Sequence, residues 1–169
     1  GEHADLLPEY HALLLGHALA RLDDQLGRQA AREQRSADAQ RLDAAAGQRY
    51  LAVLGRQRVL LGPGSFDTLS TLNNLGNFYS VRGRHELARP LLEEAVAVLG
   101  QRQGARAAAT LTARNNLGIL YYQALRMDEA AREMEAARSL RPADAAPWFY
   151  LGLIAQKAGD LGLADTLLA

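Results

Sequence analysis

The side chains that most often carry catalysis or bind metals are few in this chain, and their spacing suits neither role. The histidines are His3, His11, His17 and His85, and His11 and His17 are six residues apart. Two metal ligands on one helix face are usually four residues apart. No serine lies in a Gly-x-Ser-x-Gly motif. We therefore expect no metal site, no bound cofactor and no enzymatic activity.

The acidic pairs and the glycine-rich turn do not change this expectation. Asp23-Asp24 and Glu93-Glu94 are neighbours in sequence, and adjacent helical residues point to different faces. We expect these four carboxylates to be solvated. The turn at 62–64 lacks the lysine and the preceding strand that a phosphate-binding loop needs. Without cysteine, the chain forms neither a disulfide nor a thiolate metal site.

Charge and hydropathy also limit the partners. The 19 basic and 19 acidic residues cancel, so there is no electrostatic reason to expect nucleic acid or an anionic membrane as a partner. Eighteen of the basic residues are arginine, which is typical of proteins from GC-rich bacteria. No signal peptide or long apolar run is visible, so we expect no membrane insertion. A cytoplasmic location follows, with the periplasm as an alternative because a segment before Gly1 could have been removed.

A repeated motif organises the chain. Asn73–Tyr79 returns as Asn115–Tyr121, which sets a 42-residue period, and a third version, Phe149–Ala155, follows after a shorter, 34-residue interval. In each copy an alanine and a large apolar residue stand at the thirteenth and seventeenth positions after the Leu of Leu-Gly. Self-similarity at such a period is typical of stacked helical hairpins.

This pattern resembles the tetratricopeptide repeat family. Members of that family carry Trp, Leu-Gly and Tyr on a first helix, a small residue at the turn, and Ala, a large apolar residue and Ala on a second helix. Small residues mark the points where two helices cross closely. Trp148 fills the Trp position in the third copy, whereas Leu125 replaces the small turn residue and Ala155 replaces the Tyr.

The subtype is indicated by the Leu-Gly-Pro turn at 61–63, the pair Asn73-Asn74 and the 42-residue period. Together these features resemble the kinesin-light-chain type of tetratricopeptide repeat over about residues 42–142. The resemblance implies a repeat type that bacteria use widely, and it does not imply a motor protein.

The predicted fold class is all-α, a right-handed α-solenoid of antiparallel helix pairs. Apolar residues at spacings of three and four, together with Gly and Pro stops, place the helix boundaries. We expect about eight helices, at 6–31, 36–61, 65–81, 85–99, 107–124, 127–140, 145–158 and from 161 onward.

The predicted organisation has four hairpins. Residues 1–64 form an N-terminal helical hairpin, interpreted as a degenerate repeat because Ala46, Tyr50 and Val53 lie one 42-residue period before Ala88, Leu92 and Ala95. An unrelated hairpin remains the alternative. Repeats are expected at 65–104, 105–142 and 143–169, and the last can be truncated.

The resemblance also implies a partner-binding groove lined by the first helices of the repeats. Asparagine amides there can bind an extended peptide backbone, since each offers two donors and an acceptor. The alternative is that they bond neighbouring helices or water. The expected groove residues are Asn73, Asn74, Asn77, Ser80, Asn115, Asn116, Ile119, Tyr122, Gln123, Phe149, Tyr150, Leu153 and Lys157.

A protein–protein interaction scaffold that binds a peptide or partner segment is therefore the predicted function. The alternative is a regulatory or sensor segment of a larger signalling protein or enzyme. Lys157 is the only cation among the expected groove residues, so we expect no recognition of a chaperone's C-terminal carboxylate. We also expect self-association through the terminal helices, because leucines of the last one lack a cap; they are Leu161, Leu163, Leu167 and Leu168.

Overall fold

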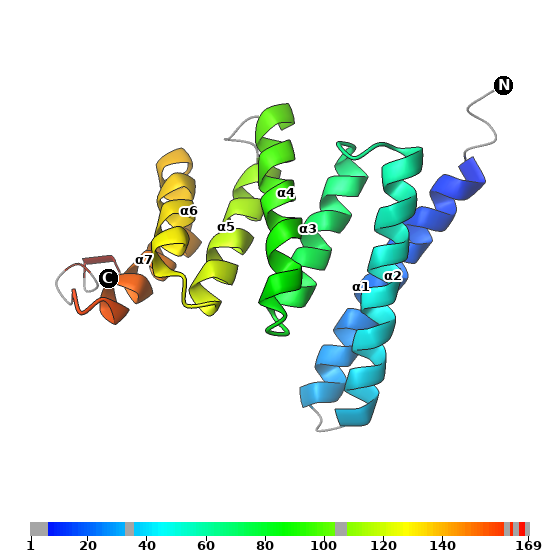
Figure 1. The fold of residues 1–169 in the computed structure, drawn as a ribbon, viewed down its shortest axis with the longest axis horizontal. Coiled ribbons are helices and arrows are strands. Elements are labelled where there is room, and N and C mark those ends of the chain that lie inside the picture. Colours follow the sequence, from blue (N-terminus) through cyan, green and yellow to red (C-terminus); the bar gives the residue numbers. More distant parts are fainter. Residues whose placement is uncertain (1–6, 33–35, 104–107, 161–162, 164–165, 168–169) are drawn as a thin grey trace. The chain divides into compact units, whose positions relative to one another are not determined.

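The computed structural model describes residues 7–32, 36–103, 108–160, 163 and 166–167. All regular elements in these ranges are α-helices, labelled α1 to α7 in Figure 1. The chain divides into two compact units, Gly1–Phe78 and Tyr79–Ala169. None of the described helices is long and apolar enough to cross a membrane.

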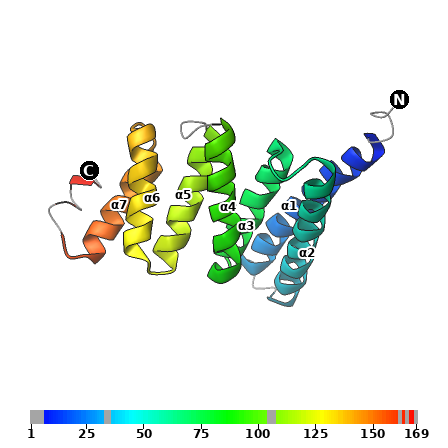
Figure 2. The ribbon, with the colours of Figure 1, turned by 45° about the horizontal axis from the view of Figure 1, so that its top comes forward.

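The first unit is built on a long helical hairpin. Helices α1 (Leu7–Arg32) and α2 (Ser36–Leu60) lie side by side along their length (Figures 1 and 2). Small residues such as Ala20 and Ala46, both 0% exposed, let the helices approach closely. Tyr50 is buried between them and lies edge-on to His17, with ring centroids 5.9 Å apart.

Helix α3 (Phe66–Ser80) follows a capped turn, and all but its last two residues belong to the first unit. Gly62 has a φ of +84°, a conformation that favours glycine. The Ser65 hydroxyl then accepts from the Thr68 amide at 3.2 Å, and the Thr68 hydroxyl donates to the Gly62 carbonyl at 2.9 Å. These bonds satisfy groups that a helix start leaves without partners, and Ser65 is one of the residues expected to cap this helix.

The second unit contains α4 (His85–Gln103), α5 (Ala108–Gln123), α6 (Met127–Leu140) and α7 (Ala145–Lys157). Each of these helices packs on the next in chain order, and α5 also contacts α7. A Cβ built on Gly118 of α5 would lie 2.7 Å from the Met134 methyl of α6. Met134 is 0% exposed, so it fills the space that the missing side chain of Gly118 leaves.

Three helix ends in this unit are alike. Gly83, Leu125 and Gly159 have φ values of 70°, 60° and 81°. In each case the amide of the next residue bonds back to a carbonyl in the last turn, such as Arg84 to Tyr79 at 3.0 Å and Arg126 to Tyr121 at 2.8 Å. This is the left-handed cap that glycine usually provides, and at Leu125 a leucine adopts it.

The all-α repeat fold is confirmed, with helix bounds close to those predicted. The structure has seven helices among its described residues, where about eight were expected. The eighth was expected from 161 onward, where positions 161–162, 164–165 and 168–169 lie outside the described residues. Of the leucines invoked for self-association, Leu163 is 48% exposed, and that association stays a prediction.

The expectation of solvated carboxylates is wrong for Asp23 and Asp24. The Asp24 side chain is only 11% exposed and pairs with Arg28 one turn along α1. The Asp23 side chain, 15% exposed, lies 2.8 Å from Nε of Arg49 on α2. The two side chains do point different ways, but both directions lead to an arginine within the unit.

Candidate partner-binding surfaces

In the first unit, the asparagines of α3 face α1. Asn74 hydrogen-bonds through Nδ2 to Nε2 of His17 at 3.1 Å. His17 is half-buried, and burial, together with the nearby charge of Arg21, lowers the pKa of its imidazole. Asn77 is exposed, whereas Asn73 is half-buried. These three asparagines were all expected in the groove, and the contact of Asn74 with His17 shows that α1 lines this surface too.

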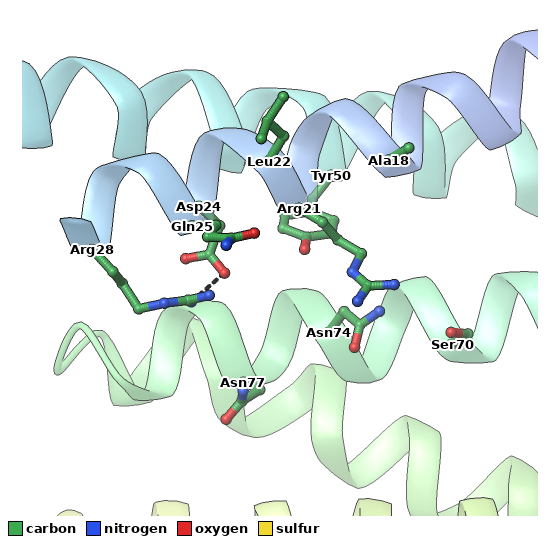
Figure 3. Close-up of a pocket in the computed structure, with 10 residues that line it drawn as sticks. All are labelled: Ala18, Arg21, Leu22, Asp24, Gln25, Arg28, Tyr50, Ser70, Asn74 and Asn77. Carbon is green, nitrogen blue, oxygen red and sulfur yellow. Dashed lines mark hydrogen bonds and ion pairs between the residues drawn. The ribbon is translucent and has the colours of Figure 1, made fainter. Parts of the chain in front are cut away.

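A pocket of about 680 Å³ opens between α1 and α3, with Tyr50 of α2 also in its wall. Figure 3 shows Arg21 reaching from α1 toward Asn74, with the Asp24–Arg28 pair beside it. The polar side chains in the wall are Arg21, Asp24, Gln25, Arg28, Tyr50, Ser70, Asn74 and Asn77. Of these, only Asn74 and Asn77 were predicted as site residues.

The α1 residues were missed because their repeat register differs from that of the later helices. In the second unit, Ser80 donates to Gln123 at 2.9 Å, and these residues are 43 positions apart, one more than the 42-residue period. His17 and Asn74 are 57 positions apart. If the same kind of neighbour contact is made, the period from α1 to α3 is about 56 positions.

Burial agrees with this longer period. Leu13 and Ala20 of α1 are buried, as are Leu69 and Gly76, their equivalents in α3. The second helix keeps the ordinary period, since Ala46, Tyr50 and Val53 are at most 6% exposed. The hairpin is therefore longer at its turn by about two helical turns in each helix. This supports the interpretation of residues 1–64 as a degenerate repeat, which stays a prediction.

In the second unit, the predicted aromatic residues form one cluster. The rings of Tyr122 on α5 and Tyr150 on α7 meet edge to face with centroids 5.5 Å apart, and Phe149 lies at the same distance from Tyr150. The Lys157 ammonium lies 5.0 Å from the Tyr122 ring centroid, within the range of a cation–π contact. Phe149 is 52% exposed although it is a large apolar side chain.

The polar residues predicted in this unit divide into structural and accessible groups. Ser80 is 3% exposed and bonded to Gln123, so it faces a neighbouring helix. Asn115 donates to the Asp144 carboxylate at 3.4 Å, and Asp144 also caps α7 by accepting from the Ala146 amide. The Asn115 Oδ1 atom is buried as well. Its side chain thus serves the α5–α7 contact, which was the alternative considered for the asparagines.

Tyr121 stands at the repeat position expected to point inward, and it is 8% exposed. Its hydroxyl donates to Oε1 of Glu93 on α4 at 2.8 Å. Burial and this carboxylate raise the pKa of Tyr121 to about 12. The phenol is therefore a neutral structural donor at ordinary pH, and Glu93 is not simply a solvated carboxylate.

Comparison with known proteins assigns the fold and the repeat. Residues 67–143 match the family model described as "Tetratricopeptide repeat". The chain is therefore a tetratricopeptide repeat protein, and such repeats are in general protein-interaction modules, typically without catalytic activity. No curated protein matches the sequence.

Solved structures of the kinesin-light-chain type share the fold. BtubC (BKLC) from P. vanneervenii is 21% identical with a TM-score of 0.70, and the match covers 89% of this chain and 60% of that one. The nearly identical TPR-like repeats of a kinesin light chain candidate from Podosopora anserina are 19% identical with a TM-score of 0.71, over 90% and 72% of the two chains. This chain thus spans less than two thirds of the BtubC chain, and identities this low establish the fold alone.

Proposed function

We propose that this chain binds a peptide or partner segment along the groove positions of its first helices, and thereby acts as an interaction scaffold. The observation that carries the proposal is the aromatic cluster of the second unit, formed by Tyr122, Phe149 and Tyr150. Exposed aromatic rings gathered on one surface are typical of binding sites.

The cluster combines an apolar floor with a fixed charge. Phe149 and Tyr150 are adjacent on α7, and the half-buried Ile119 and Leu153 occupy groove positions on α5 and α7. The position of Lys157 over the Tyr122 ring keeps the cation at this surface. A partner segment with apolar side chains would bury these residues, and each buried large apolar side chain contributes about 1.5–3 kcal/mol.

The asparagines have unequal parts in this proposal. Asn115 holds α7, so we assign it a positioning role. Asn116 is half-buried and also occupies a groove position on α5. Asn77, in the first unit, is exposed and forms no hydrogen bond with any described residue. An amide of this kind can bond a peptide backbone without regard to its side chains.

Selection from a display library of short random peptides tests the function, because the partner's sequence is not needed. The strongest selected peptide is titrated calorimetrically into the parent protein, Phe149→Ala and Leu87→Ala. Leu87 is a matched control, since it is 51% exposed in the same unit but lies on α4, a second helix.

We expect Phe149→Ala to weaken binding about tenfold or more, as loss of a buried aromatic anchor does, and Leu87→Ala to leave it unchanged. Equal affinities for the parent and Phe149→Ala, or selection of no peptide, would overturn the proposal.

A further inference from the structure

We propose that the pocket between α1 and α3 binds a carboxylate of the partner segment, with Arg21 as the anchoring cation. This inference rests on the partner-binding function proposed above and adds the chemistry of the partner: an acidic residue or a chain end. Nothing in the repeat pattern predicted it, because the 42-residue period does not align α1 with the groove.

Arg21 differs from the other arginines of the hairpin in having no acidic partner. Arg28 pairs with Asp24, and Arg49 pairs with Asp23. Arg21 forms neither an ion pair nor a hydrogen bond with any residue that the structure describes, and Figure 3 shows it extending into the space between α1 and α3. A guanidinium offers a planar set of donors that matches a carboxylate in a two-point contact.

The charge balance of the pocket favours an anion. Its wall contains two arginines and one carboxylate, Asp24. Since Arg28 neutralises Asp24, the charge of Arg21 remains uncompensated in the wall. The nearby Asp67 of α3 accepts a hydrogen bond from the Tyr10 hydroxyl at 3.0 Å, so its carboxylate is engaged on the other side of His17.

Neutral donors surround the cation. Ser70 and Asn77 on α3 and Gln25 on α1 line the same pocket, and none of them bonds another described residue. They can complete the hydrogen bonds of a carboxylate that Arg21 holds, and bonds to a charged group are stronger than neutral ones. The volume of about 680 Å³ accommodates an acidic side chain with its adjoining backbone.

The experiment uses the same library of short random peptides with a depletion step. Phage that bind the Arg21→Glu variant are removed first, and the remaining phage are selected on the parent protein. We expect the survivors to be enriched in Asp and Glu. The strongest acidic peptide should bind Arg21→Gln at least about tenfold more weakly than the parent. Arg32→Gln, a change of the same charge at an exposed position near the end of α1, should leave its affinity unchanged.

Changes in the peptide separate the two sources of the carboxylate. Replacing its Glu by Gln should weaken binding to the parent protein but not to Arg21→Gln if a side chain enters the pocket. Amidation of the C-terminus should have that effect instead if the chain end enters. Arg21→Lys keeps the charge without the planar donors and should bind with intermediate affinity.

The inference is overturned if the survivors show no acidic enrichment, or if Arg21→Gln and Arg32→Gln bind the acidic peptide equally. In the same experiments, selection without depletion reports on the proposed function alone. Peptides that depend on Phe149 but are indifferent to Arg21 would refute the carboxylate pocket and leave the proposed function standing. Circular dichroism of each variant confirms that the helices are retained.

Discussion

The two units bury their helices by the same rule but present different chemistry at their surfaces. In both, a small residue on a first helix meets a larger one on the second: Gly16 faces Val53 in the first unit, and Gly118 faces Met134 in the second. At the groove positions, however, the first unit presents charged and amide side chains around a pocket, whereas the second presents an aromatic cluster.

This difference shows which positions the repeat constrains. A helix crossing tolerates only small side chains, because packing there leaves no space. The groove side chains are free to differ, since nothing in the hairpin depends on them. The first unit could therefore lengthen its hairpin and acquire Arg21 while its buried positions stayed close to the repeat pattern.

The largest expected effect comes from emptying the crossing in the second unit. Met134→Ala should lower the free energy of unfolding by about 2–5 kcal/mol, because it removes a fully buried side chain and leaves a cavity against Gly118. Val53→Ala removes fewer atoms in the first unit and should cost about 1.5–2.5 kcal/mol. Urea unfolding followed by circular dichroism measures both. A loss at Met134 smaller than the loss at Val53 would contradict the packing described.

The helix ends give a smaller effect with opposite signs at two equivalent positions. Leu125→Gly should stabilise the protein by about 1 kcal/mol, because it relieves a left-handed backbone at a side chain that is 70% exposed. Gly83→Leu should destabilise it by about 1–2 kcal/mol. A Cβ at Gly83 meets no atom within 4 Å, so its cost comes from the backbone alone. Thermal unfolding of both variants checks this, and changes of the same sign would refute it.

The smallest effect appears only in alkali. The folded protein keeps Tyr121 protonated up to a pKa of about 12, whereas the usual value is 10.0. Because the unfolded chain releases this proton first, the contribution of Tyr121 is complete below pH 10 and is lost as the pH rises toward 12. Tyr121→Phe should therefore flatten the fall in stability across this window.

The same change at Tyr10 in the first unit should flatten the curve less. The pKa of Tyr10 is raised mainly by its hydrogen bond to Asp67, with burial the least of the causes. Unfolding in urea at a series of alkaline pH values measures both variants. An unchanged slope in Tyr121→Phe would show that its phenol is not held neutral by the fold.

The sequence predicted the fold well because the repeat motif marks the points of close packing. Leu75, Leu92 and Met134 are buried at the places that the Leu-Gly and alanine offsets indicated. The site was predicted less well, for two reasons. Nothing in the sequence distinguishes Asn115, which holds α7, from an asparagine that binds a peptide.

The second reason is the change of register in α1. One 42-residue period back from Asn77 stands Arg35, whereas the longer period of about 56 positions leads to Arg21. The longer hairpin could have been suspected from the length of polar and alanine-rich sequence at 28–40. Only the contact between His17 and Asn74 fixes the shift.

The most direct test of partner binding at the groove positions uses the two isoleucines of the chain. Ile119 occupies a groove position on α5, and Ile154 lies on α7 at a position outside the groove. With the δ1-methyl groups labelled, methyl NMR gives one signal for each residue. Addition of the selected peptide should shift the Ile119 signal strongly and the Ile154 signal little. A shift of Ile154 with Ile119 unchanged would contradict this account.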